Sequence, residues 1–173
     1  MADGFFKRWL GRADGTAAVR PLYQSIVAKA RDLHWYVEGG VADTIDGRFE
    51  MIAAIFSLVM IRLEALGDPA KVDVAMLTEV FVEDMDGQLR ELGFGDVGLG
   101  KRVGEMVSAL GGRLGAYRDG LAGVGDFEAA LVRNLYREQA PAAPALAFTA
   151  AKLRADGGVI GTLSLETLRA GQL

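Results

Sequence analysis

The chain has 173 residues, of which 51% are apolar, and it carries a net charge of −4. This length and composition suffice for a buried core, and the negative charge gives no general reason to expect nucleic acid as a partner. The lack of cysteine excludes disulfides and thiolate sites, and a single histidine, His34, excludes His-rich metal centres. No apolar run is long enough to span a membrane, and no signal peptide is recognisable. We therefore expect a cytoplasmic protein without a metal or other cofactor.

The first twelve residues combine aromatic and basic side chains. On a helix, Phe5, Phe6 and Trp9 would share one side, with Lys7 and Arg8 around it. Such a segment suits the membrane interface, where aromatic rings lie at headgroup depth and cations meet anionic lipid. These five residues are our candidates for peripheral contact with the inner face of the cytoplasmic membrane. The alternative is that the aromatic rings dock onto the core of the protein.

After an expected linker over residues 14–16, a helix is predicted from Pro21, because proline is tolerated in a first helical turn. His34 is predicted to be a hydrogen-bonded packing residue, since no second histidine supports a catalytic role. Gly39 and Gly40 should end this helical region. The apolar stripe of the helix consists of Leu22, Ile26, Ala30, Leu33 and Val37.

A strongly apolar helix is predicted next, and its broad apolar face places it at the centre of the fold. Asp43 and Asp46 precede this helix, and each is expected to cap or approach its N-terminus. The helix should end at Gly67-Asp68-Pro69. Its apolar positions are Phe49, Ile52, Ile55, Phe56, Val59, Met60, Leu63 and Leu66.

Residues 83–118 contain two patterns that resemble nucleotide-binding loops. Residues 93–98 fit G-x-G-x-x-G, and residues 95–102 fit the phosphate loop up to Arg102, where a Ser or Thr is needed. Both loops function only between a strand and a helix. The apolar residues on either side recur with helical spacing, so we predict a helix–loop–helix in which Gly93 ends the first helix.

Charged faces flank this loop. The helix predicted over residues 72–92 is acidic on its polar side, which is the ordinary pattern of a solvated face. The following helix opens with cations, which oppose the helix dipole, so a partner carboxylate from Asp96 or from another molecule is expected. The acidic helix carries Glu79, Glu83, Asp84, Asp86 and Arg90, and the expected cationic surface comprises Lys101, Arg102, Arg113 and Arg118.

The last third of the chain is also predicted to be helical. Gly123 to Asp126 should end one helix and cap the next, and a further helix is expected over Leu146 to Leu153. Gly157-Gly158 should stop that helix, and a last short helix is expected over Thr162 to Ala170.

Taken over the whole chain, these patterns predict one compact all-α domain of about six to eight helices, because no alternating pattern supports a strand. We expect it to divide into an N-terminal segment (1–16), a helical core (17–138) and a C-terminal extension (139–173).

Several motifs taken in order resemble the ubiquinol–cytochrome c chaperone family, the assembly factors of the cytochrome bc1 complex. The resemblance covers roughly residues 20 to 136. The motifs that carry it are Asp43-Thr44-x-Asp46-Gly47-Arg48-Phe49, Asp84-Met85-Asp86 with Leu89 to Gly93, Gly95-Asp96 with Gly100 to Val103, Gly112-Arg113-Leu114-x-Ala116-Tyr117, and Arg133-Asn134-Leu135-Tyr136.

This resemblance implies a non-enzymatic chaperone that binds newly made cytochrome b, or another bc1 subunit, during assembly of the complex. We hypothesise that the charged residues around the central loop form its partner-binding surface. These residues are Asp84, Asp86, Arg90, Asp96, Lys101 and Arg102.

Two other functions remain open on the sequence alone. Asp43-x-x-Asp46 and Asp84-x-Asp86 could bind magnesium in a helical prenyl-diphosphate enzyme, because magnesium prefers a few carboxylates together with phosphate oxygens. Alternatively, the apolar helices could line a cavity for lipid or quinone, although a Met- and Phe-rich stripe is more often plain core.

Overall fold

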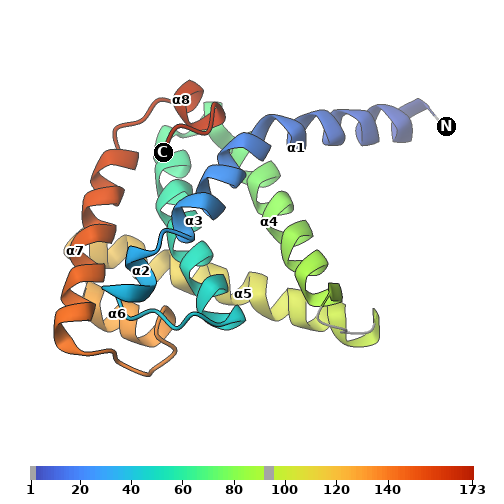
Figure 1. Ribbon diagram of the computed structural model, residues 1–173. Helices are drawn as coiled ribbons and strands as arrows, with labels where there is room; N and C mark the ends of the chain where they lie inside the picture. Colours follow the sequence, from blue (N-terminus) through green and yellow to red (C-terminus); the bar gives the residue numbers. More distant parts are fainter. Residues whose placement is uncertain (1–2, 92–95) are drawn as a thin grey trace.

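The computed structural model describes residues 3–91 and 96–173, and side chains are considered there except for residues 3–14, 96–100, Leu89, Arg102, Val103 and Met106. Every regular element in these ranges is a helix, so the all-α prediction is confirmed (Figure 1). The elements are α1 (Asp3–Ala30), α2 (His34–Val37), α3 (Ile45–Leu66), the 3-10 helix η1 (Asp68–Ala70), α4 (Lys71–Glu91), α5 (Asp96–Leu121), α6 (Phe127–Asn134), α7 (Ala143–Ile160) and α8 (Leu165–Arg169).

Helix α3 is the central element of the fold, as predicted. All residues from Met51 to Met60 are buried, and α1, α4, α5 and α7 pack around this helix. The helix ends at Gly67, whose φ of 71° lies in the left-handed region that favours glycine. A helix that is apolar on nearly all sides must be covered on nearly all sides, which explains the arrangement.

Helix α1 runs without interruption through residues 14–16, so the expected linker is wrong (Figure 1). Thr16 is buried, and Gly15 lies so close to α4 that an added Cβ would be 2.8 Å from Sδ of Met76. Pro21 lies inside the helix rather than at its start, with the buried residues Leu22 and Ile26 following it. Packing against α3 and α4 therefore outweighs the local signals of glycine and proline.

The last two residues of the apolar stripe predicted for the helix from Pro21 do not reach the core. The helix stops at Ala30, and Leu33 and Val37 are 73% and 67% exposed. Instead Trp35 is fully buried, and its indole nitrogen donates a hydrogen bond to the carbonyl of Lys29 at 2.8 Å. The His34 ring lies against Trp35 at a tilt of 50°, with 4.4 Å between ring centroids. Its Nε2 is buried without a hydrogen-bond partner, so the expected hydrogen bond is absent at that atom.

The helix–loop–helix around the glycine-rich stretch is confirmed, because α4 precedes it and α5 follows it. Gly93 itself lies outside the described residues. Helix α4 packs along α1, and its own C-terminal end adjoins the start of α5.

The C-terminal helices cover α3 and α5. Asp126 caps α6 by accepting a hydrogen bond from the amide of Ala129 at 3.0 Å, as expected. Helix α7 continues through Gly157 and Gly158 to Ile160, so the predicted stop is wrong. At Gly157 an added Cβ would lie 3.5 Å from Leu58 and 3.6 Å from Leu121, at ordinary van der Waals distance, so this position packs against side chains of α3 and α5 within a continuous helix.

Candidate partner-binding surface

Asp84 faces α1 rather than open solvent. Its Oδ2 accepts a hydrogen bond from the hydroxyl of Tyr23 at 2.7 Å and another from Nε2 of Gln88 at 2.9 Å. Burial raises the pKa of the Tyr23 phenol, and the hydrogen bond to Asp84 raises it further, so the hydroxyl stays protonated and donates. Asp84 therefore joins α4 to α1 and also lines a groove between these helices.

Asp86 and Arg90 lie on the other side of α4. Two residues along a helix are rotated by about 200°, so Asp84 and Asp86 cannot point in the same direction. Asp86 accepts a hydrogen bond from Nε of Arg90 at 2.8 Å, and both side chains are partly exposed. The structure thus places these two residues on a solvated face, apart from Asp84.

Lys101 is exposed on the first turns of α5, with its Nζ 3.9 Å from Glu105. Asp96 is the first residue of α5 and Arg102 lies on the same turns, but their side chains are outside the described residues. By backbone position, Asp86, Arg90, Asp96, Lys101 and Arg102 lie at the end of α4 and the start of α5, whereas Asp84 faces α1.

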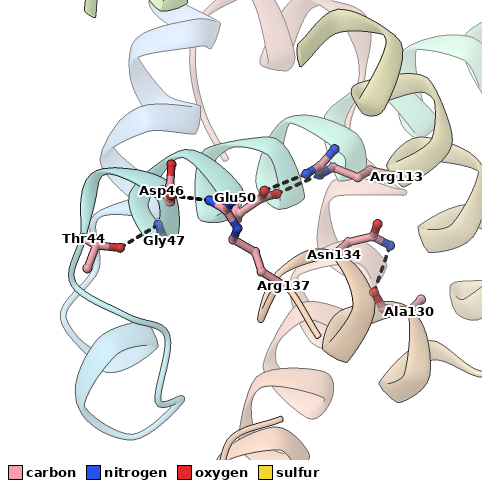
Figure 2. A network of polar contacts seen from close by, with 8 residues as sticks. All are labelled: Thr44, Asp46, Gly47, Glu50, Arg113, Ala130, Asn134 and Arg137. Atoms are coloured by element: carbon pink, nitrogen blue, oxygen red, sulfur yellow. Dashed lines mark hydrogen bonds and ion pairs between the residues drawn. The ribbon is translucent and has the colours of Figure 1, made fainter. Parts of the chain in front are cut away.

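The expected cationic surface on α5 does not extend to Arg113. This residue points inward, where Nε and Nη2 donate to the two carboxylate oxygens of Glu50 at 2.7 and 2.6 Å (Figure 2). Arg118 pairs with Glu64 on the surface. The partner carboxylates for these cations thus come from α3, which the sequence did not reveal.

Glu50 and Arg113 form a buried ion pair inside the helical body. Glu50 is 3% exposed, and burial raises the pKa of its carboxyl, while the hydrogen bonds from Arg113 act in the opposite direction. The Arg113 guanidinium also lies 5.9 Å from the ring centroid of Phe49. The pair fixes α5 against the first half of α3.

Glu50 was missed because acids on a helix are usually solvated. A signal was present, since Glu50 stands next to a run of apolar residues that covers all sides of α3. An acid in such a position must be buried and therefore needs a cation.

The N-terminus of α3 is capped by Thr44 and not by Asp43 or Asp46. Oγ1 of Thr44 accepts a hydrogen bond from the amide of Gly47 at 3.1 Å. Asp43 pairs with Arg48 at 2.7 Å, and Asp46 pairs with Arg137 (Figure 2). Asp43 precedes the cap and Asp46 lies in the first turn of α3, so both approach the N-terminus as expected, but Thr44 takes the capping role while the two aspartates pair with arginines.

Arg137 reaches Asp46 from an unusual backbone conformation. Arg137 and Glu138 have φ angles of 52° and 65°, which non-glycine residues adopt infrequently. The turn is held by Tyr136, whose buried hydroxyl donates to the carbonyl of Gly39 at 2.6 Å. Asn134 closes the preceding helix by donating to the carbonyl of Ala130 at 2.9 Å (Figure 2).

Three motifs that are far apart in the sequence thus meet around the first half of α3. Residues 43–49, 112–117 and 133–136 are brought together by two ion pairs, in which Glu50, next to the first motif, binds Arg113, and Arg137, next to the third, binds Asp46. The family model described as ubiquinol-cytochrome C chaperone matches residues 37–173, a range that includes all three motifs. The chain belongs to the ubiquinol-cytochrome C chaperone family. The resemblance predicted from the sequence is therefore confirmed.

A solved structure supports the same family membership. The crystal structure of the Cbp3 homolog from Brucella abortus aligns with 100% of this chain and 95% of its own, at 30% identity and a TM-score of 0.79. None of the curated proteins matches the chain. The family model begins at residue 37, so α1 lies before the matched range, whereas the structural match includes it.

Within the described part of the chain, no helix is long and apolar enough to cross a membrane. The same residues contain no group of three or more His, Cys, Asp or Glu placed to hold a metal ion. The proposed membrane-contact residues, from Phe5 to Trp9, belong to the first turns of α1, and their side chains are outside the described set.

Proposed function

We propose that this chain is a non-enzymatic assembly chaperone of the ubiquinol–cytochrome c reductase complex and that its client is newly made cytochrome b. The observation that carries the proposal is the family match over residues 37–173. The likeness to the Cbp3 homolog along the whole chain supports it. The alternative of a prenyl-diphosphate enzyme would need aspartates that bind magnesium. Asp43, Asp46 and Asp86 each pair with an arginine instead, which favours the chaperone.

The client-binding surface in this proposal is the corner between α4 and α5. It consists of Asp84, Asp86, Arg90, Asp96, Lys101 and Arg102. Arg90 and Lys101 are exposed and Asp86 is partly exposed at the end of α4 and the start of α5, so charges of both signs are available there. Charge pairing across an interface favours correct encounter and register. In Figure 1 the end of α4 and the start of α5 lie away from α7 and α8.

The free end of α1 provides the contact with the membrane in this proposal. In Figure 1 the first turns of α1 extend beyond α4 and away from the other helices. Phe5, Phe6 and Trp9 would enter the interface, with Lys7 and Arg8 at anionic headgroups. Such a contact would hold the chaperone where a membrane subunit emerges.

The test is a mild-crosslinking pull-down of the tagged chain from its own membranes. We expect recovery of cytochrome b, and we expect Lys101→Glu with Arg102→Glu to reduce that recovery while helical content is retained. Lys71→Glu is the control, because Lys71 is an equally exposed lysine at the opposite end of α4. Absence of every bc1 subunit from the pull-down would refute the function, whereas equal recovery by all variants would refute the surface alone.

A further inference from the structure

A groove lies between α1 and α4, with a volume of about 470 Å³. Its longer wall runs along one face of α1 from Arg20 and ends at Arg31, just after that helix, and its shorter wall runs from Val80 to Asp84 on α4. Figure 1 shows why the walls differ, because the two helices cross and then diverge toward their C-terminal ends. Part of the α1 face, including Val27, is therefore only partly covered.

The two walls carry opposite charge. Arg20 and Arg31 line the groove on the side of α1, and Glu83 and Asp84 line it on the side of α4. The walls are bridged at one end by Arg20 and Glu83, whose nearest atoms are 3.4 Å apart and whose side chains are 56% and 52% exposed. An ion pair that is long and this exposed contributes little to stability, so its exchange for another pair costs little.

Asp84 differs from Glu83 in this respect. Its Oδ2 already holds hydrogen bonds from Tyr23 and Gln88, and the Tyr23 side chain is buried. Asp84 is thus a fixed negative charge in the groove, while Glu83 is a carboxylate that can change partners.

We propose that the groove binds a basic, amphipathic segment of the client, whose Lys or Arg replaces Arg20 at Glu83. This inference rests on the proposed function and adds the chemistry of the segment. The stem of a Lys or Arg is apolar and would lie over Val27 and Val80 while its cation reaches Glu83 and the field of Asp84. Membrane proteins carry an excess of Lys and Arg in their cytoplasmic loops, so such a segment is what a membrane client offers there.

Arg20 acts in this arrangement as an internal competitor. In the free protein it neutralises Glu83, which keeps the acidic wall on α4 from attracting basic segments indiscriminately. At the other end of the groove, Arg31 is exposed and repels a second cation, so the bound segment is oriented with its basic end toward α4.

The test uses the full chain and a fluorescein-labelled synthetic peptide of leucine, alanine and arginine, about a dozen residues long to match the wall of α1 at roughly 1.5 Å per residue. Binding is followed by fluorescence anisotropy at low salt. We expect Glu83→Gln to weaken binding about tenfold, because a charge-assisted contact is lost. We expect Arg20→Gln to strengthen it about threefold, because the competitor is removed.

The matched control is Glu64→Gln, which removes the carboxylate of another exposed arginine pair, with Arg118, outside the groove. It should bind the peptide like the unmodified chain. Unchanged binding in Glu83→Gln would overturn the inference. So would tighter binding of a peptide with glutamate in place of arginine, lost in Arg31→Gln, because the groove would then select acidic segments.

The inference and the proposed function can fail separately. If deletion of the gene abolishes bc1 assembly and Glu83→Gln restores it fully, the function stands and the groove inference falls. If deletion leaves bc1 assembly intact, the proposed function falls, and the client-based inference falls with it even where the peptide binds.

Discussion

The carboxylate of Glu50 and the guanidinium of Arg113 form a two-point hydrogen-bonded pair inside the helical body, although 63 residues separate them in the chain. The carboxylate side chain is 4% exposed and the guanidinium side chain 14%. A buried pair of this kind contributes little net stability compared with apolar packing, but breaking it leaves an uncompensated charge. The pair therefore fixes the register of α5 on α3 and makes each partner dependent on the other.

Removal of the cation should be costly. We expect Arg113→Met to lower the free energy of unfolding by about 3–5 kcal/mol, because Glu50 would remain buried without a partner. The measurement is urea denaturation followed by circular dichroism. Arg118→Met is the matched control, because it breaks an exposed pair on the same helix and should cost less than about 1 kcal/mol. Equal losses in the two variants would contradict the assignment of a buried pair.

The cost of Arg113→Met should also depend on pH. Burial raises the pKa of Glu50, and Arg113 lowers it, so loss of Arg113 raises that pKa further. Because the native variant then holds a proton that the unfolded chain releases, its stability is greatest below the ordinary Glu pKa and falls as pH rises through the raised pKa. We expect the deficit relative to wild type to be larger at about pH 8 than at about pH 5.

The control for this pH dependence is the double variant Glu50→Gln with Arg113→Met. It carries no titrating group at this position, so its deficit relative to Glu50→Gln alone should not vary with pH. Denaturation curves at several pH values measure both differences. A deficit of the single variant that grows as pH falls would show the opposite sign and contradict the prediction.

Much of the fold was predictable because α3 and α4 have strong helical periods. Phe49 to Leu66 identifies a central helix, and the apolar residues on both sides of the glycine-rich loop exclude a strand there. Three of the failures share one cause. At Gly15, Pro21 and Gly157 a local helix breaker is overruled by tertiary contacts, which a single sequence does not display.

The candidate site was predictable only in part. Charged residues around the central loop could be identified, but the sequence does not tell which side of a helix meets a neighbour. Asp84 therefore proved to contact Tyr23, and Arg113 turned inward to Glu50. Pairs of residues this far apart in the sequence meet only when the helices pack. In the sequence alone, each of these charged side chains looks like an ordinary surface residue.

Gly47 should tolerate no side chain. An added Cβ would lie 2.0 Å from the carbonyl oxygen of Ala42, and this neighbour is backbone. We expect Gly47→Ala to cost at least about 2 kcal/mol by displacing the loop that carries Thr44 and Asp43. Gly87→Ala in α4 is the matched control, because nothing lies within 4 Å of its added Cβ, and it should stabilise the helix by about 0.5–1 kcal/mol. Thermal denaturation compares the two, and a neutral Gly47→Ala would contradict the close contact.

The C-terminal segment after α8 should control the stability of α1. The hydroxyl of Ser25 donates to the carbonyl of Gly171 at 2.5 Å, and Gly171 has a φ of 72°. An added Cβ at Gly171 would lie 2.6 Å from the carbonyl oxygen of Pro21, so Gly171→Ala combines backbone strain with a clash. We expect faster amide hydrogen exchange in α1 around Ser25, while the amides of α6 keep their protection.

The contrast between these helices separates a local effect from general destabilisation. Gly158→Ala is the control, because Gly158 lies in α7 with nothing within 4 Å of its added Cβ. It should leave exchange in α1 unchanged. If Gly171→Ala accelerates exchange equally in α1 and α6, the segment stabilises the whole domain through Leu168, which is fully buried, and has no special hold on α1. Selective acceleration in α1 means that the last residues of the chain secure the helix whose free end is proposed to meet the membrane.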